Sequence, residues 1–212
     1  MKGFLLRFKG SQVGATAAEF AMVLPVAILF LLGTIDVGRL MWTWNKAEKA
    51  TQFGARYAVV TNIIPSGLSS YSFAVSGGIP QGDLIPQSSF GGAHCELASA
   101  TNPLSALSCT CNTGATCPAL GIADPSAFSN IVDRMRLMEP SIAKHNVVVE
   151  YNYSGLGYAG DPNGINIATL VTVKLRNMTF TPLVFQAFGT SITLPDFRAS
   201  LTLEDGVGSA SN

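Results

Sequence analysis

The sequence of 212 residues predicts an α+β fold, with a long N-terminal helix and a small antiparallel sheet. An apolar run lies near the N-terminus, a Gly- and Ser-rich middle holds all four cysteines, and the last third alternates apolar with polar residues. With 13 Lys and Arg against 13 Asp and Glu, the chain has no basic excess to bind nucleic acid. We expect four segments: a basic leader (1–14), a helix (15–62), a loop-rich region with the cysteines and one helix (63–146), and an antiparallel β region (147–212).

The predicted helix begins with an apolar run over residues 15–35, in which Glu19 is the only charged residue. At a rise of ~1.5 Å per residue, this run is long enough to cross a hydrocarbon core of ~30 Å. Trp42 and Trp44 follow, and aromatic side chains of this kind gather at membrane interfaces. A buried core helix is the alternative interpretation, but the uncharged stretch 20–35 favours a single membrane span.

The leader is short and basic, with Lys2, Arg7 and Lys9 and no acidic residue. The apolar run is not followed by the small-residue pattern of a secretory cleavage site, so we expect the helix to stay attached to the chain. Basic residues also follow the span, so their distribution does not decide the orientation in the membrane.

The four cysteines lie in one Gly-, Ser- and Thr-rich stretch, and their even number predicts two disulfides formed in an oxidising compartment. They are Cys95, Cys109, Cys111 and Cys117. The single residue between Cys109 and Cys111 makes that pairing unfavourable, and the other two pairings remain open. A four-thiolate zinc site is the alternative, but the spacings are not those of two close pairs. We therefore expect most of the chain outside the cytoplasm and the leader inside.

Beyond the span, small residues at helical spacing extend the helix towards Asn62 and would let another helix or a sheet approach closely. These residues are Ala47, Ala50, Thr51, Gly54 and Ala58. A second helix is expected from the N-cap Asp124 to about Glu139. Its apolar face consists of Phe128, Ile131, Val132 and Met135.

Three segments near the C-terminus alternate between an apolar and a polar face: residues 147–154, 171–176 and 197–204. This pattern predicts three antiparallel strands with one face in water. The dry face requires a cover, which the helix after the span or the helix at Phe128 would supply.

No catalytic motif is present in the sequence. The G-x-G-x-x-G at Gly155–Gly160 follows a predicted strand, but turn-forming residues come next instead of the helix that a dinucleotide site needs. His94 and His145 belong to no metalloprotease motif, and we interpret His94, beside Cys95, as an exposed loop residue. We therefore expect no enzyme, no cofactor or metal, and no small-molecule substrate.

The junction between leader and span resembles that of a prepilin. In type IV pilins and their relatives, a membrane peptidase cleaves after a glycine and leaves a mature chain whose fifth residue is Glu, followed by an aromatic residue. This resemblance implies cleavage between Gly14 and Ala15, with Glu19 fifth and Phe20 after it. On physical grounds alone, a carboxylate in an apolar span costs a few kcal/mol and needs a partner, which the new ammonium of Ala15 could supply.

Residues 14–62 resemble the TadE-like family, minor pilin-like components of the tight-adherence pilus assembly system. The matching elements are Gly14 with Glu19-Phe20, Leu24-Pro25, Asp36, Gly38-Arg39 and Ala55-Arg56-Tyr57-Ala58. Asp36 and Arg39 lie three residues apart on a helix, so we expect them to pair at the membrane boundary.

The resemblance implies a structural pilin-like protein of the bacterial inner membrane, with its N-terminus in the cytoplasm and its C-terminal region in the periplasm or outside the cell. Its implied partners are the lipid bilayer, a prepilin peptidase, other pilin-like subunits and the pilus assembly machinery. The resemblance leaves open whether the chain enters the filament. The alternative is a membrane-anchored periplasmic binding or hydrolytic module unrelated to pili.

Overall fold

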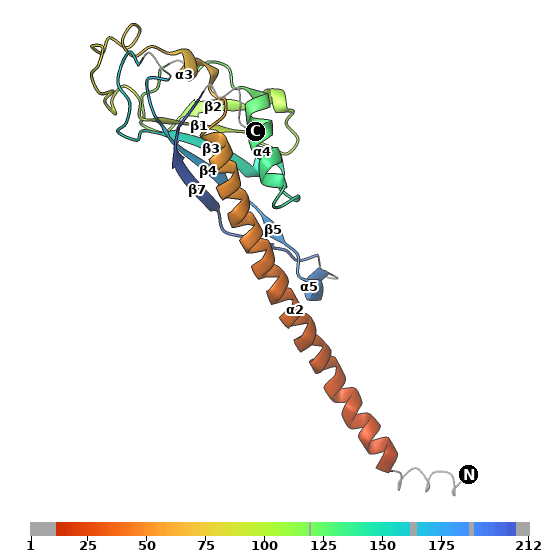
Figure 1. The fold of residues 1–212 in the computed structure, drawn as a ribbon. Helices are drawn as coiled ribbons and strands as arrows, with labels where there is room; N and C mark the ends of the chain where they lie inside the picture. Colours follow the sequence, from red (N-terminus) through yellow and green to blue (C-terminus); the bar gives the residue numbers. More distant parts are fainter. Residues whose placement is uncertain (1–11, 119, 162–164, 187–188, 207–212) are drawn as a thin grey trace, which may run out of the picture. The chain divides into compact units, whose positions relative to one another are not determined.

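The computed structural model describes residues 12–118, 120–161, 165–186 and 189–206 (Figure 1). The helices are α2 (Gln12–Ala58), α3 (Ser66–Ser70), α4 (Pro125–Arg136) and α5 (Leu183–Gln186), with short 3-10 turns at Leu104–Ala106 and Lys144–Asn146. The strands are β1 (Gly92–Glu96), β2 (Ser108–Cys111), β3 (Val147–Asn152), β4 (Leu170–Leu175), β5 (Thr179–Phe180), β6 (Ile192–Thr193) and β7 (Phe197–Thr202). The predicted α+β fold, with a long apolar helix and an antiparallel sheet, is confirmed.

The chain forms two compact units, and the boundary between them falls inside α2. The first unit consists of Met1–Trp42 and Phe180–Ile192, and the second of Thr43–Thr179 and Thr193–Asn212. The chain therefore leaves the second unit at β5, contributes one segment to the first, and returns at β6.

The main sheet of the second unit has five strands in the order β2-β1-β3-β4-β7, and every neighbouring pair is antiparallel. The prediction of three strands was wrong in number, because β1 and β2 come from the cysteine region that we expected to be loops. These two strands are short and rich in small polar residues, so they lack clear alternation. Their pairing depends on β3, which β1 joins over five residues.

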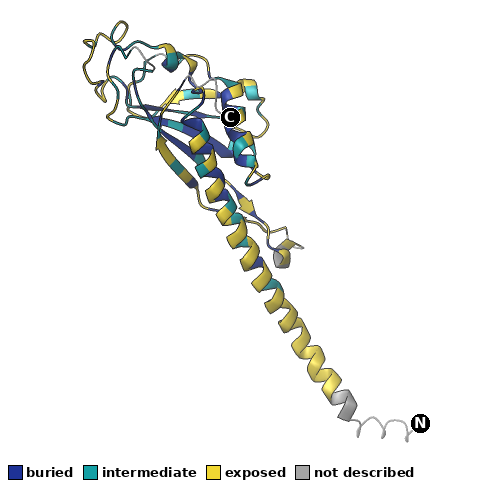
Figure 2. Ribbon diagram, in the orientation of Figure 1, coloured by how far each residue is buried: buried dark blue, intermediate teal, exposed yellow. Residues whose placement is uncertain are grey.

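The dry face of the sheet is fully buried on its three inner strands, β1, β3 and β4. The side chains on it are Ala93, Cys95, Val147, Val149, Tyr151, Val171, Val173 and Leu175. The part of α2 in the second unit and the apolar face of α4 pack on it (Figure 2). A Cβ atom added to Gly54 would lie 2.8 Å from Cγ of Met135 on α4 and 3.3 Å from Cγ1 of Val173 on β4. The prediction that small residues permit close approach is confirmed.

Helix α2 ends at Ala58, earlier than the predicted end near Asn62. The backbone carbonyl of Val59 accepts hydrogen bonds from the backbone N–H groups of Glu204 and Asp205, at 3.0 and 2.9 Å. These bonds come from the C-terminal segment, so a tertiary contact marks the end of the helix, together with the local bond from the Thr61 hydroxyl to the Tyr57 carbonyl.

Helix α4 has the predicted N-cap, since the carboxylate of Asp124 accepts the backbone N–H of Ser126 at 2.8 Å. It ends at Arg136, although the sequence suggested Glu139. Pro140 explains part of the difference, because a proline disfavours helical geometry in the residue before it.

Strand β7 departs from the predicted alternation at Leu201, an apolar residue of the segment 197–204 that is 40% exposed. Phe197, at the start of the same strand, is buried and meets Trp44 edge to face with ring centres 5.1 Å apart. Because β7 is the edge of the sheet, its neighbours cover only part of its length.

Candidate functional site

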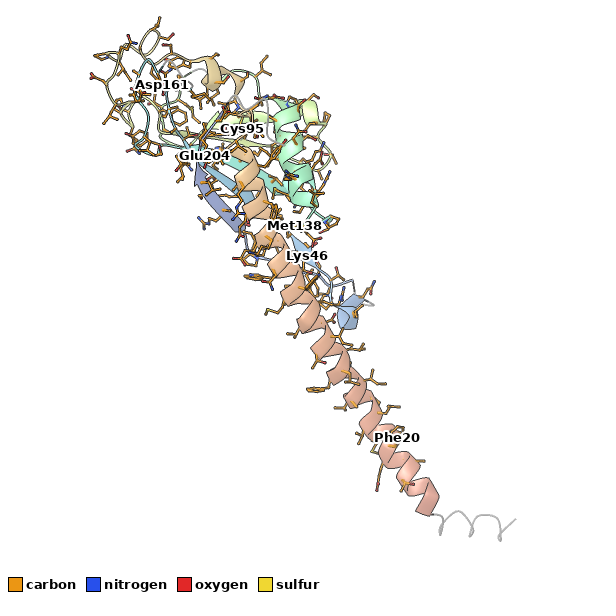
Figure 3. All side chains as sticks on the ribbon, viewed as in Figure 1. Phe20, Lys46, Cys95, Met138, Asp161 and Glu204 are labelled. Atoms are coloured by element: carbon orange, nitrogen blue, oxygen red, sulfur yellow. A yellow bond between two sulfur atoms is a disulfide. The ribbon has the colours of Figure 1, made fainter. Side chains whose placement is uncertain are left out.

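The first-unit part of α2 exposes large apolar side chains along its length. These are Phe20, Met22, Val23, Val26, Leu29, Phe30, Leu31, Ile35 and Val37, each more than half exposed. Figure 2 shows this part of the helix as exposed, and Figure 3 shows Phe20 directed away from it. Exposure of apolar area to water costs roughly 25 cal/mol per Å², so this surface favours an apolar surrounding. Among the described residues, this helix alone is long and apolar enough to cross a membrane.

The predicted processing junction lies at the start of α2. Gly14 and Ala15 have helical backbone, whereas the side chain of Ala15 and the whole of leader residues 1–11 lie outside the described part of the chain. Glu19 and Phe20 are exposed on the same helix. The junction and the acidic residue are therefore about one helical turn apart, since four residues of helix rise ~6 Å.

Asp36 and Arg39 form an ion pair on α2, with 2.8 Å between Oδ1 of Asp36 and Nη1 of Arg39. The same carboxylate oxygen accepts the backbone N–H of Leu183 at 2.9 Å, and Asp36 is only 7% exposed. The guanidinium of Arg39 lies over the ring of Phe180, 5.3 Å from its centre. We call these four residues the boundary junction. Hydrogen bonds to charged groups contribute about 1.5–3 kcal/mol each, so this cluster fixes the segment Phe180–Ile192 to α2.

The sequence predicted the Asp36 and Arg39 contact but not the other half of the boundary junction. Leu183 lies 147 residues from Asp36 in the chain. Its contribution is a backbone N–H, which every residue except proline carries, so no side-chain pattern indicated it. The helix spacing of Asp36 and Arg39, in contrast, is a local signal.

All four cysteines form disulfides, and the pairs are Cys95 with Cys109 and Cys111 with Cys117. This is one of the two pairings that the sequence left open. The first bond joins β1 to β2 where the two cysteines face each other in register. The second closes the loop after β2. Together they fix the edge of the sheet formed by the cysteine region.

His94 lies on β1 and not in the exposed loop that we expected. Its Nδ1 is 2.9 Å from Oδ1 of Asn112, and its Nε2 is 3.1 Å from Oγ1 of Thr110. Both ring nitrogens therefore take part in a hydrogen-bonded row on the wet face of the sheet, which also contains Asn152. His94 therefore contributes to the hydrogen-bonded surface of the sheet.

The Gly-rich motif lies in an irregular loop between β3 and β4, as the turn residues predicted. Gly157 has a φ of +107°, and an added Cβ would lie 2.4 Å from the carbonyl oxygen of Asn166. Residues 165–169, which lead into β4, contain no helix. Gly157 therefore serves a close backbone approach within the loop.

A long exposed apolar helix and a disulfide-bonded α+β unit fit a single-pass membrane protein. Residues 14–56 match the family model of the TadE-like protein, about a fifth of the chain. The match begins at Gly14 and includes Glu19, Asp36 and Arg39. No curated protein and no solved structure matches the chain. The family match indicates a role related to tight-adherence pili.

Proposed function

We propose that the chain is a structural, non-catalytic pilin-like component of a tight-adherence pilus assembly system. In this proposal a prepilin peptidase cleaves it after Gly14, and the first part of α2 anchors it in the bacterial inner membrane. The observation that carries the proposal is that the TadE-like match begins at Gly14 and continues along an exposed apolar helix. A structural role suits such a helix, because neighbouring helices or lipid can cover its exposed sides.

Glu19 gives the proposed cleavage a chemical purpose. Before cleavage, its carboxylate would enter the apolar region at a cost of about 2.5–3.5 kcal/mol on the insertion scale. Cleavage creates an ammonium at Ala15, one helical turn away, on the same chain. That ammonium, or the one on a neighbouring subunit, would neutralise the carboxylate and so favour close assembly of mature chains.

The disulfides support the proposed orientation. Structural disulfides persist in oxidising compartments such as the periplasm and are rare in the bacterial cytoplasm. Both disulfides belong to the second unit. We therefore place the second unit in the periplasm or outside the cell, and the basic leader in the cytoplasm.

Replacement of Gly14 tests the processing step. In native membranes, the wild-type chain should begin at Ala15 by intact mass and N-terminal peptide analysis, whereas Gly14→Leu should keep residues 1–14. Gly33→Leu is the matched control, because a Cβ at Gly33 would have no atom within 4 Å. Normal processing of Gly14→Leu, or a wild-type chain that starts at Met1, would contradict the proposal.

Replacement of Glu19 tests the assembly step separately. Glu19→Gln keeps the shape of the side chain but removes its charge, so cleavage at Gly14 should continue while cross-linking to other pilin-like subunits falls. Glu48→Gln changes an exposed glutamate in the second-unit part of α2 and is the control. Equal cross-linking by both variants would show that the charge of Glu19 has no part in assembly.

A further inference from the structure

The segment Phe180–Ile192 contains helix α5. It belongs to the first unit, together with the first part of α2. Figure 1 shows α5, which lies within it, beside α2. The boundary junction joins the segment to α2 by two contacts: the N–H of Leu183 donates to Asp36, and the ring of Phe180 lies under the guanidinium of Arg39.

The composition of this segment is unusual for a surface in water. The chain has no Asp, Glu, Lys or Arg between Asn177 and Pro195. The large apolar side chains that the structure describes in the segment are Phe180, which is buried, and Leu183 and Ile192. Leu183 is 41% exposed and Ile192 is 46% exposed. Apolar surface gathered in this way marks an interaction site for a protein or a membrane.

The boundary junction sets the depth of the segment along α2. Asp36 directly follows Ile35, the last residue of the apolar run. If residues 15–35 cross the hydrocarbon core, which takes about 20 residues, Asp36 lies where the core meets the headgroups. The hydrogen bond from Leu183 holds the segment at this level, and Phe180 lies about one helical turn further out, beside Arg39.

We propose that the segment Phe180–Ile192 docks on the lipid bilayer, with the exposed side chains of Leu183 and Ile192 inserted between headgroups and upper acyl chains beside α2. The inference rests on the proposed membrane span. Lipid is the occupant that the observations favour, because the apolar surface of the segment adjoins that of the span and carries no charge. Interfacial elements of this kind bury their apolar face ~5–10 Å deep. The segment would act as a stop that fixes how far α2 enters the membrane.

Depth-dependent fluorescence quenching tests this inference on the full-length chain. Single cysteines are introduced at two exposed positions of the segment, Gln186→Cys and Thr190→Cys, and labelled with a fluorophore. The labelled chains are reconstituted into phosphatidylcholine and phosphatidylglycerol vesicles that carry a nitroxide either high or low on the acyl chain. Val26→Cys reports on the span itself, and Gln87→Cys is the matched control at an exposed glutamine of the second unit.

The labels at Gln186 and Thr190 should be quenched at least about twofold more by the shallow nitroxide than the label at Gln87, as expected for an interfacial depth. The label at Val26 should be quenched more by the deep nitroxide. If the labels at Gln186 and Thr190 are quenched no more than the label at Gln87 while the label at Val26 is quenched, the membrane span is supported and the docking inference is overturned. If Val26 is not quenched either, the membrane proposal itself fails.

A second copy of the chain is the other occupant that the test can reveal. In that case, unlabelled Gln186→Cys chains would form disulfide-linked dimers in the vesicles when an oxidant is added, and the fluorophore on labelled chains would be quenched by neither nitroxide. This result would overturn docking on lipid. Monomeric, quenched chains would support it.

Discussion

The two parts of α2 differ in which residues are exposed and which are buried. In the first-unit part, large apolar side chains such as Phe30, which is 71% exposed, face outward. In the second-unit part, the residues that face the protein are mainly Ala, Gly and Thr, and they are fully buried. Burial along one helix is therefore set by what surrounds each turn and not by the size of the apolar side chain. Large residues suit a surrounding of lipid or other helices, and small ones suit close contact with a sheet.

Polar contacts border the close packing in the second unit. Lys46 on α2, labelled in Figure 3, forms an ion pair with Glu139 at 3.8 Å, and the guanidinium of Arg134 lies over Tyr57. Partly exposed pairs of this kind contribute only about 0–1 kcal/mol each. Most of the stabilisation must therefore come from the buried apolar contacts between α2, α4 and the sheet.

The largest difference between the two parts should appear in the free energy of unfolding when a buried phenylalanine is replaced. Phe128→Ala removes a fully buried ring from α4 and should lower the free energy of unfolding by about 3–5 kcal/mol. Phe30→Ala, in the exposed part of α2, should change it by less than about 0.5 kcal/mol. Urea unfolding in detergent micelles, followed by near-UV circular dichroism, measures both. Similar losses for both variants would mean that the first part of α2 also packs inside the protein.

Insertion into the membrane should instead depend on residues in the first-unit part of α2. Val26→Lys should cost about 3 kcal/mol of insertion free energy, because it puts a charge near the middle of the apolar run. Val75→Lys, at an exposed valine of the second unit, should cost nothing measurable. The fraction of chain that resists carbonate extraction from membranes is the measurement. Unchanged extraction of Val26→Lys would argue against the span.

The close approach at Gly54 should be sensitive to a single methyl group. Gly54→Ala forces Met135 and Val173 to move and should destabilise the second unit by about 2 kcal/mol. Gly33→Ala meets no atom within 4 Å and should be neutral or slightly stabilising, because Ala favours helix by about 1 kcal/mol over Gly. Thermal unfolding of the two variants gives the difference. A neutral Gly54→Ala would show that the contact relaxes without strain.

The smallest effect concerns the hydroxyl of Tyr151, which accepts the backbone N–H of Ile64 at 3.0 Å. Tyr151→Phe should cost about 1 kcal/mol near neutral pH through the lost hydrogen bond. Burial raises the pKa of Tyr151, so the folded chain holds this proton at a pH where the unfolded chain releases it. The associated stability is present below pH ~10 and declines above it, by up to about 1.4 kcal/mol per pH unit.

Urea unfolding between pH 7 and 11 measures this contribution as the difference between the wild type and Tyr151→Phe. The difference should shrink above pH 10, because only the wild type loses the stability linked to this hydroxyl. Tyr158→Phe, at an exposed tyrosine, is the control. A difference that stays constant with pH would mean that the hydroxyl ionises equally in both states.

The sequence predicted the elements whose residues carry strong local periodicity. Helices α2 and α4 and strands β3, β4 and β7 have dense apolar patterns, and Asp124 is a local cap signal. Strands β1 and β2 were missed because their stability comes from β3 and from the Cys95–Cys109 bond, which are tertiary features. Contacts such as that of Leu183 with Asp36 depend on topology, so the periodicity of either segment alone could not indicate them.

The close packing at Gly54 also has a consequence for the order of events during synthesis. Val173, which closes over Gly54, is synthesised much later in the chain. At about 5–20 residues per second, roughly ten seconds pass before the strand that covers this face of α2 exists. A face of Leu or Phe left bare for so long would invite aggregation, whereas one of Ala, Gly and Thr adheres only weakly to other chains. The small residues therefore leave little apolar surface on this face of α2 before the sheet forms.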